Sequence, residues 1–416
     1  MGRSHLLVRK EEAMRHLRFI LIPAVLFLLP GIGMAGWESQ ISGTAQHLKS
    51  VFFPMNVQTG FVAGDSGIIL KTTNGGASWA RLVTGTTTNL WTVRFPVDDQ
   101  TGFAVGWYGL ILKTTDGGTS WATLPSGTAN SLRSVHFPVD VQTGYTVGIS
   151  GTILKTTNGG SSWASIYTGS TSFRSVQFPN DAQTGYVAGS IGTILKTTDG
   201  GVSWTRLPTG TSEWLWPVYF PSDDQTGYAA GDYGTILKST DGGASWATQV
   251  SGNFGYLNSI HFPQNPWTGY IVGGDVGPGG PIVLKTTDGG ASWSSQFTGL
   301  TSDLWSVFFP GNDQTGYVAG NSGTILKTTD GGIGVEEARS TVFRIRTVGL
   351  RITPNPFTSF AAVPGHSSES FALYDISGRK VGIYKGDRIG VGLSAGIYFL
   401  KPEGKDSKPL RIVKLR

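Results

Sequence analysis

The chain contains no cysteine among its 416 residues, so neither disulfides nor cysteine-ligated metal sites are available to it. Charged residues are also scarce, at 14%. The six histidines follow no metal-ligating spacing, and we expect no metal or other cofactor. After residue 35 no stretch shows the 3.6-residue hydrophobic period of a helix, so a phosphate-binding loop before a helix is excluded and no nucleotide site is expected.

Positive charge is concentrated at the two ends of the chain. The formal net charge is +5, but residues 36–332 contain 13 basic and 18 acidic residues, a net charge of −5. The basic balance of the whole chain therefore does not predict that this central part binds nucleic acid.

A repeat fills that central part. The phrase Lys-Thr-Thr-(Asp/Asn)-Gly-Gly, in close variants, recurs at intervals of 41 to 47 residues, and its first glycines are Gly75, Gly117, Gly159, Gly200, Gly242, Gly289 and Gly331. Each copy contains a Phe-Pro step, a Thr-Gly-aromatic step, an Ile-Leu-Lys run and, in most copies, a Ser-Trp, which read as four short strands joined by turns. Four strands in about 42 residues are typical of one propeller blade, so the sequence predicts an all-β, seven-bladed β-propeller over 36–332.

The two ends of the repeat predict how the ring closes. Tryptophan follows every Gly-Gly turn except the last, after Gly332. Trp37 lies 42 residues before Trp79 and supplies the missing copy. We therefore expect the segment 37–42 to form the fourth strand of the last blade, which leaves no exposed sheet edge.

Residues 1–35 are typical of a signal peptide. Arg15 and Arg18 precede the apolar run 19–29, and Gly33-Met34-Ala35 fits a small-residue cleavage site. Translation from Met14 would keep all of these features. A membrane anchor is the alternative, but the apolar run is short for one.

The C-terminal part reads as a linker, 333–349, followed by a small immunoglobulin-like β-sandwich, 350–416. Its motifs are Pro354-Asn-Pro-Phe357 and the strand-like stretches 371–381, 393–401 and 411–416. In that order they closely resemble the C-terminal sorting domain of the bacterial type IX secretion system. The resemblance implies recognition by that secretion machinery and a secreted or cell-surface protein, with the membrane only as a place of attachment. A generic immunoglobulin-like stalk is the alternative.

The Gly-Gly turns resemble the Asp-box, or BNR repeat, of sialidases and related propellers. In those families the motif is structural and lies on the outer rim, away from catalysis. A calcium loop is the alternative, but the extra ligands are missing. The aspartates expected to accept backbone N–H bonds inside these turns are Asp116, Asp199, Asp241, Asp288 and Asp330.

The whole repeat, from the Thr-Gly-aromatic step to Gly-x-x-Gly-x-Ile-Leu-Lys-Thr-Thr-Asp-Gly-Gly-x-Ser-Trp, is similar to the photosystem II assembly and stability factor propellers. The resemblance covers residues 36–332. It implies the propeller fold and a protein-binding habit, and it does not imply photosynthesis.

Residues that break the repeat are the candidates for a functional site. The acidic residues that no repeat position explains are Glu38, Asp65, Glu213, Asp232, Asp275 and Asp303, and all but Glu38 fall on the face of the turns between second and third strands. Basic residues group on blades three and four, and acidic ones on blades five, six, seven and one. The predicted ligand-binding face comprises Lys49, Trp91, Trp107, Tyr108, Arg133, Arg174, Trp214, Trp216, Tyr233, Asn258, Asp303 and Trp305. The alternative is that these residues only cap the core.

Three classes of function remain open. The first is a non-catalytic module that binds a protein or polysaccharide through aromatic residues and charge. The second is a glycoside hydrolase or lyase of the Asp-box type, with Asp65, Asp232 and Asp275 as its acids and bases. The third is a structural surface-layer component.

Two familiar enzymes of the second class fit poorly. The near-match Phe343-Arg-Ile-Arg346 lacks the proline of the sialidase motif and lies after the propeller. Xyloglucanase-like enzymes use two facing propellers, and this chain has one.

Overall fold

The computed structural model describes residues 36–253, 255–274, 280–296 and 300–332 and, in the C-terminal part, 362–363, 370–375, 379–385, 388–389, 391–402 and 410–414. The signal segment 1–35, the linker 333–349 and Asp275 lie outside the described residues. Within them, strands dominate, and the helices are three single turns of 3-10 helix. No helix in this part of the chain is long and apolar enough to span a membrane.

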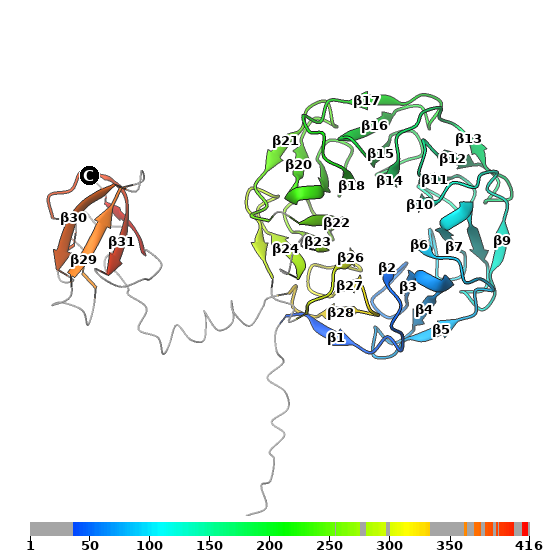
Figure 1. Cartoon of the computed structure of the whole chain (residues 1–416), viewed down its shortest axis with the longest axis horizontal. Helices are drawn as coiled ribbons and strands as arrows, with labels where there is room; N and C mark the ends of the chain where they lie inside the picture. The colour runs from blue at the N-terminus through cyan, green and yellow to red at the C-terminus, as the bar shows by residue number, and fades with distance from the viewer. Residues whose placement is uncertain are drawn as a thin grey trace, which may run out of the picture. The chain divides into compact units, whose positions relative to one another are not determined.

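Seven four-stranded antiparallel sheets form a ring, as Figure 1 shows, and each is one blade of a β-propeller. Residues of the first strands line a channel at the centre of the ring. The first strand of each blade lies beside the channel and the fourth lies at the rim. In blades one to four the strands are β2 (Leu48–Phe52), β3 (Gly60–Gly64), β4 (Ile69–Thr72), β5 (Ala80–Leu82); β6 (Leu90–Arg94), β7 (Gly102–Gly106), β8 (Ile111–Thr114), β9 (Ala122–Leu124); β10 (Leu132–His136), β11 (Gly144–Gly148), β12 (Ile153–Thr156), β13 (Ala164–Ser165); β14 (Phe173–Gln177), β15 (Gly185–Gly189), β16 (Thr193–Thr197), β17 (Thr205–Leu207). In blades five to seven they are β18 (Leu215–Tyr219), β19 (Gly227–Gly231), β20 (Ile236–Ser239), β21 (Ala247–Gln249); β22 (Tyr256–His261), β23 (Gly269–Gly274), β24 (Pro281–Thr286), β25 (Ser294–Ser295); β26 (Leu304–Phe308), β27 (Gly316–Gly320), β28 (Ile325–Thr328) and β1 (Glu38–Gln40).

The N-terminal strand closes the ring. β1 pairs with β28 so that Glu38 lies opposite Lys327, and the backbone N–H of Gly36 donates to Asp330 Oδ2 at 3.0 Å. Trp37 is buried and its ring meets Phe309 edge-on, with 5.9 Å between centroids. The predicted seven-bladed fold and its closure by an N-terminal strand are therefore confirmed.

A stacked pair of aromatic rings joins each blade to the next. The Phe of the Phe-Pro step stacks on the aromatic residue of the Thr-Gly-aromatic step in the preceding blade, with centroids 3.8 to 4.2 Å apart. The pairs are Phe61–Phe95, Phe103–Phe137, Tyr145–Phe178, Tyr186–Phe220, Tyr228–Phe262, Tyr270–Phe309 and, across the closure, Tyr317–Phe53. The aromatic positions of the repeat therefore form the interfaces between neighbouring blades.

The lysine of each repeat also binds the following blade. In blade seven, Lys327 Nζ donates to the carbonyl oxygen of Gly75 at 2.7 Å, and the hydroxyl of Tyr317 donates to the same oxygen at 2.9 Å. Equivalent lysine bonds occur at all six other interfaces. The Gly-Gly turn of one blade is therefore a hydrogen-bond acceptor for its neighbour.

The Asp-box turns are held by their own side chains. Asp116 Oδ1 accepts from the N–H of Ser120 at 2.9 Å and Oδ2 accepts from its hydroxyl at 2.6 Å. These bonds lower the pKa of Asp116 to about 2, because they stabilise the carboxylate. Gly117 and Gly118 have φ of 69° and 87°, which a residue with a Cβ adopts at a cost. The geometry is that of a structural turn.

The described C-terminal residues form one antiparallel sheet with the order β30-β29-β31-β32. Its strands are β29 (Ser370–Tyr374), β30 (Lys380–Lys385), β31 (Gly396–Pro402) and β32 (Leu410–Lys414). Within the stretch 371–381, expected as strands broken by Gly turns, the described residues belong to the end of β29 and the start of β30, and Arg379 Nε pairs with Asp375 Oδ2 at 3.1 Å. The motif 354–357 lies outside the described residues, so the sandwich stays a prediction.

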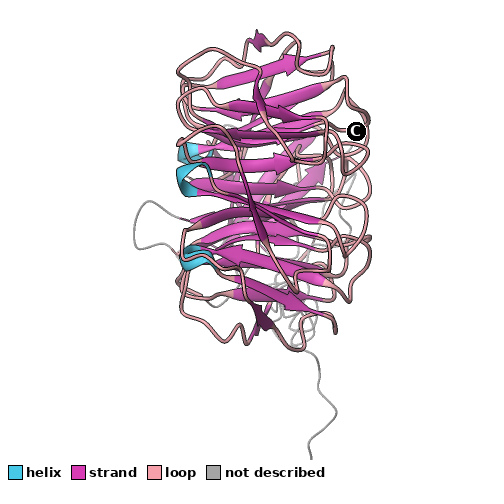
Figure 2. Cartoon of the chain, turned by 90° about the vertical axis from the view of Figure 1, so that its right-hand side faces the viewer, coloured by secondary structure: helices cyan, strands magenta, loops and turns pink. Residues whose placement is uncertain are grey.

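The propeller has two different faces. One carries the turns between second and third strands together with the blade-to-blade connections, and we call it the turn face. The three 3-10 helices, η1 (Asp65–Gly67), η2 (Trp107–Gly109) and η3 (Asp232–Gly234), all lie at this face, on one side of the ring in Figure 2. The Asp-boxes lie at the opposite face.

Candidate functional site

The turns on the turn face present single residues in a left-handed conformation. The middle residue of each described turn has φ between 53° and 56°, and the glycine after it approaches another backbone; a Cβ on Gly67 would lie 2.1 Å from Thr86 O. Serine occupies the middle position in blades one, three and seven. Blades two, four and five have Tyr108, Ile191 and Tyr233, which are 72%, 62% and 58% exposed. A left-handed non-glycine residue costs about 1–3 kcal/mol. Serine satisfies the same turn in three blades, so the fold itself does not explain large side chains that are mostly exposed.

Seven residues from equivalent positions line the channel where it opens on the turn face, and we call them the mouth ring: Lys49, Trp91, Arg133, Arg174, Trp216, Asn258 and Trp305. A β-bulge places each of them. In blade one, Leu48 pairs with Gly64 and Ser50 with Ala63, which leaves Lys49 outside the ladder. The bulge turns a residue of a core strand toward the channel, so the repeat can vary it without disturbing the blade.

Cations pack against indole rings in the mouth ring. Lys49 Nζ lies 4.0 Å and Arg133 Cζ 3.9 Å from the centre of the Trp91 ring. Arg174 Cζ lies 4.1 Å from the Trp216 ring and 5.3 Å from the Trp214 ring. Such contacts contribute about 0.5–2 kcal/mol each, so the ring is organised before any ligand arrives.

Trp305 contacts both Trp91 and Trp216 across the channel. Its ring centroid is 5.9 Å from that of Trp91 and 6.1 Å from that of Trp216. These rings come from blades seven, two and five, so side chains of non-adjacent blades meet at the centre. The sequence predicted the seven positions but not these contacts.

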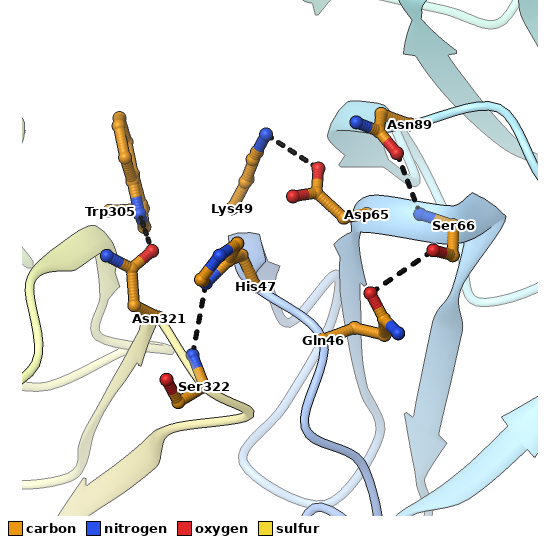
Figure 3. A network of polar contacts seen from close by, with 9 residues as sticks. All are labelled: Gln46, His47, Lys49, Asp65, Ser66, Asn89, Trp305, Asn321 and Ser322. Atoms are coloured by element: carbon orange, nitrogen blue, oxygen red, sulfur yellow. Dashed lines mark hydrogen bonds and ion pairs between the residues drawn. The ribbon is translucent and has the colours of Figure 1, made fainter.

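Polar groups on the turns fix three of the mouth-ring side chains. Lys49 pairs with Asp65 at 2.6 Å, and Trp305 Nε1 donates to Asn321 Oδ1 at 2.7 Å (Figure 3). Trp216 Nε1 donates to Asp232 Oδ1 at 2.5 Å. In each pair the turn residue lies 16 positions after the ring residue, so the first residue of the turn orients the side chain beside it.

The two predicted catalytic carboxylates that the structure describes are therefore both engaged. Burial raises the pKa of Asp232, while its bond to Trp216 and the charge of Arg174 act in the opposite direction. Asp65 serves as the counter-ion of Lys49. Asp275, the third candidate, lies outside the described residues.

The other predicted face residues surround the mouth ring. The rings of Trp107 and Tyr108 meet edge-on with centroids 6.1 Å apart, and Trp214, which is 38% exposed, lies beside Arg174. Asp303 Oδ2 accepts from Asn321 Nδ2 at 3.3 Å, which ties it to the group that holds Trp305.

Several buried polar atoms of the mouth ring have no hydrogen-bond partner among the described residues. They are Trp91 Nε1, Arg133 Nε and Nη1, Arg174 Nε and Asn258 Oδ1. Unpaired buried donors are costly, so these atoms are the ones that a bound group would satisfy.

Sequence reasoning missed a second ring deeper in the channel, three residues after the mouth ring in each first strand. This inner ring consists of Phe52, Arg94, His136, Gln177, Tyr219, His261 and Phe308. Four of its members bond a carbonyl oxygen of the next blade: His136 Nε2 to Phe178, Gln177 Nε2 to Phe220, Tyr219 Oη to Phe262 and His261 Nε2 to Phe309. The available signal was a polar residue repeated on an otherwise apolar core strand.

The full lining of the channel also changes the charge pattern that the sequence suggested. Basic residues were expected on blades three and four. Lys49 of blade one and Arg94 of blade two also line the channel, whereas no acidic residue does. The residues that the structure describes contain no cluster of three metal-ligating side chains.

The chain is similar to a known propeller family over part of its length. The sequence profile described as photosynthesis system II assembly factor YCF48 matches residues 31–128, 83–169 and 126–213. No curated protein sequence matches the chain at a significant level.

Solved structures share the fold. YCF48 from Cyanidioschyzon merolae has a TM-score of 0.59 and 20% identity over 71% of this chain and 99% of that chain. YCF48 bound to D1 peptide has a TM-score of 0.59 and 22% identity over 72% and 99%. The GH74 enzyme of Niastella koreensis has a TM-score of 0.59 and 18% identity over 71% of this chain and 54% of that chain. At these identities the likeness shows the propeller fold alone, and this chain spans about half the length of the GH74 enzyme.

Proposed function

We propose that this chain is an exported, non-catalytic recognition module that binds a protein segment on the turn face of its propeller. One observation carries the proposal: Tyr108, Ile191 and Tyr233 expose large apolar side chains at left-handed positions where the other described turns use serine. Exposed aromatic anchors beside a charged, preorganised pocket are typical of binding surfaces.

A protein ligand is favoured over a polysaccharide because the central rings are already occupied. Sugar recognition relies on free aromatic faces, yet two cations contact the ring of Trp91 and one contacts that of Trp216. The solved complex of YCF48 with D1 peptide supports peptide binding by a propeller of this fold. A polysaccharide is the second candidate ligand, and a structural surface-layer role the third.

The ligand class is tested by capture on the immobilised full chain. We expect a cell-surface extract of the source organism to yield a bound species that protease treatment of the extract abolishes and glycosidase treatment does not. A glycan array should show no binding. Array binding together with protease-resistant capture would replace the protein ligand by a polysaccharide, and no capture at all would favour the structural role.

The Asp-box glycoside hydrolase or lyase is the alternative activity, and the raised pKa of Asp232 is the observation that favours it. Asp232→Asn retains an amide oxygen for the Trp216 bond while removing the acid. The recognition proposal expects this variant to keep ligand binding and to have no hydrolytic activity to lose. Depolymerisation of a polysaccharide by the wild type but not by this variant would establish the enzyme instead.

Export rests on the two ends of the chain. The signal segment 1–35 and the resemblance of 350–416 to a type IX sorting domain support passage across both membranes, with the secretion machinery as a partner. Expression in a host with that machinery tests this: we expect the full chain at the surface or in the medium, and a chain ending at residue 349 to stay in the periplasm. Equal release of both chains would refute the sorting role.

A further inference from the structure

The channel at the centre of the propeller is a cavity of about 400 Å³. Four cationic side chains line it, Lys49 and Arg133 and Arg174 in the mouth ring and Arg94 in the inner ring, and none of its lining residues is acidic. The net charge of residues 36–332 is −5, so this concentration of positive charge runs against the charge of the domain around it.

Only one of the four cations has a carboxylate partner in the part of the chain that the structure describes. Lys49 pairs with Asp65. Arg94 Nη1 donates to the carbonyl oxygen of the preceding residue, Val93, at 3.0 Å, and Arg94 Cζ lies 4.9 Å from the centre of the Phe52 ring. Arg133 and Arg174 contact indole rings, with Nε of both and Nη1 of Arg133 buried and unpaired. The charge of Asp232 opposes the lowering of the pKa of Arg174, but the hydrogen bond of Asp232 Oδ1 is with Trp216 Nε1.

Three guanidinium groups therefore share one cavity, and none of them forms an ion pair with a carboxylate among the residues that the structure describes. Burial lowers the pKa of Arg94 to about 10 and that of Arg174 to about 10, and burial together with the charge of Arg174 lowers the pKa of Arg133 to about 9. All three remain protonated at neutral pH. Buried charges in proteins are normally paired, and here the pairing group is not part of the described chain.

Hydroxyl groups add further donors between the two rings. Ser134 Oγ accepts from the N–H of Val176 at 3.4 Å, and Ser175 Oγ accepts from the N–H of Val218 at 2.9 Å. Both serines line the cavity, and neither hydroxyl hydrogen has an acceptor among the described residues. A group bound between the rings would thus meet guanidinium and hydroxyl donors.

We propose that the channel is a binding site for a small free oxyanion, inorganic sulfate or phosphate, held by Arg94, Arg133 and Arg174. The planar guanidinium fork matches oxyanion geometry and bonds two oxygens at once, which favours an oxyanion over a halide. A dianion offsets most of the uncompensated charge. The site lies inside the channel, so the proposal is independent of the protein ligand proposed for the exposed turns.

The repeat offers variants that the fold already tolerates. Gln177 of blade four occupies the position equivalent to that of Arg94, and Asn258 of blade six occupies the position equivalent to that of Arg133. Arg94→Gln and Arg133→Asn therefore remove a charge while using side chains that this fold accommodates at the same place. Arg81→Gln is the matched control, because Arg81 lies on β5, a rim strand, outside the cavity lining.

The experiment is a calorimetric and thermal-melt titration of the full chain with sodium sulfate, sodium phosphate, sodium acetate and sodium chloride at matched ionic strength. We expect saturable heat with sulfate and phosphate, and a melting temperature that rises with the logarithm of their concentration once it exceeds the dissociation constant. Sulfate stabilises most proteins without saturation, and that linear part should be all that remains in Arg94→Gln/Arg133→Asn, whose affinity falls about tenfold or more. Arg81→Gln should match the wild type.

Other outcomes overturn the proposal. No saturable heat with the wild type, which needs no variant to fold, would do so, as would a sulfate curve that Arg94→Gln/Arg133→Asn leaves unchanged. Chloride binding as tight as sulfate would show that the site does not select oxyanions. Saturation by acetate alone would indicate a carboxylate, such as one supplied by a partner protein, in place of the free ion.

Discussion

Arg133 Cζ lies 3.9 Å from the centre of the Trp91 ring, and that contact joins blade three to blade two at the mouth of the channel. Lys49 contacts the same ring from blade one. The mouth of the channel is thus organised by contacts between blades, and its chemistry belongs to the ring as a whole.

Ile191→Asn should stabilise the propeller by about 1 kcal/mol. Ile191 has φ of 56°, where a β-branched residue is strained, and asparagine adopts this conformation more readily. The Ile191 side chain is largely exposed, so little packing is lost. Urea denaturation measures the change, and a destabilised variant would show that Ile191 makes contacts that stabilise the free protein.

Tyr317→Phe should cost about 1 kcal/mol, because it removes the hydroxyl that donates to the Gly75 carbonyl oxygen while keeping the ring stacked on Phe53. Blades one and two already use phenylalanine at this position, Phe61 and Phe103. Phe53→Ala should cost about 3–5 kcal/mol, since it empties the interface that closes the ring. Equal costs for the two variants in the same denaturation series would refute the assignment of stacking as the main contact.

Stability should fall as the pH drops from about 6.5 to about 4. Burial lowers the pKa of His136 and of His261 to about 4, and the charge of Arg94 adds to this. Below pH 6.5 the unfolded chain binds protons that the folded chain does not, which costs about 1.4 kcal/mol per pH unit for each histidine.

His136→Gln/His261→Gln should flatten the stability curve over that range. Glutamine occupies the same position in blade four, where Gln177 bonds the carbonyl oxygen of Phe220 as the histidines bond theirs. Thermal melts of both proteins from pH 4 to pH 7 make the comparison. Parallel curves would place the acid sensitivity elsewhere.

Local sequence signals were enough to predict the fold, because the Gly-Gly turns and the Phe-Pro steps each mark a fixed place in a blade. Trp37, which precedes the first repeat instead of following the last Gly-Gly turn, marked the strand that closes the ring. The mouth-ring positions also followed from the repeat. The contacts of Trp305 with Trp91 and Trp216 did not, since they depend on side-chain directions across a channel between blades far apart in sequence. Arg94 was missed for a related reason, because a basic residue on a core strand shows its role only when the strand is seen to face a channel.

Ligand capture by two matched variants tests the central claim most directly. Tyr108→Ser/Ile191→Ser/Tyr233→Ser gives three turns the residue that Ser66, Ser150 and Ser322 already provide in the other blades. Trp267→Ser is the control. Trp267 is 61% exposed, and its backbone carbonyl oxygen accepts from the N–H of Gly289 in the Asp-box turn of blade six, on the opposite face. We predict that the triple variant loses at least about 90% of the captured ligand and that the control keeps it. Equal capture by the triple variant and the wild type would contradict recognition by the turn face.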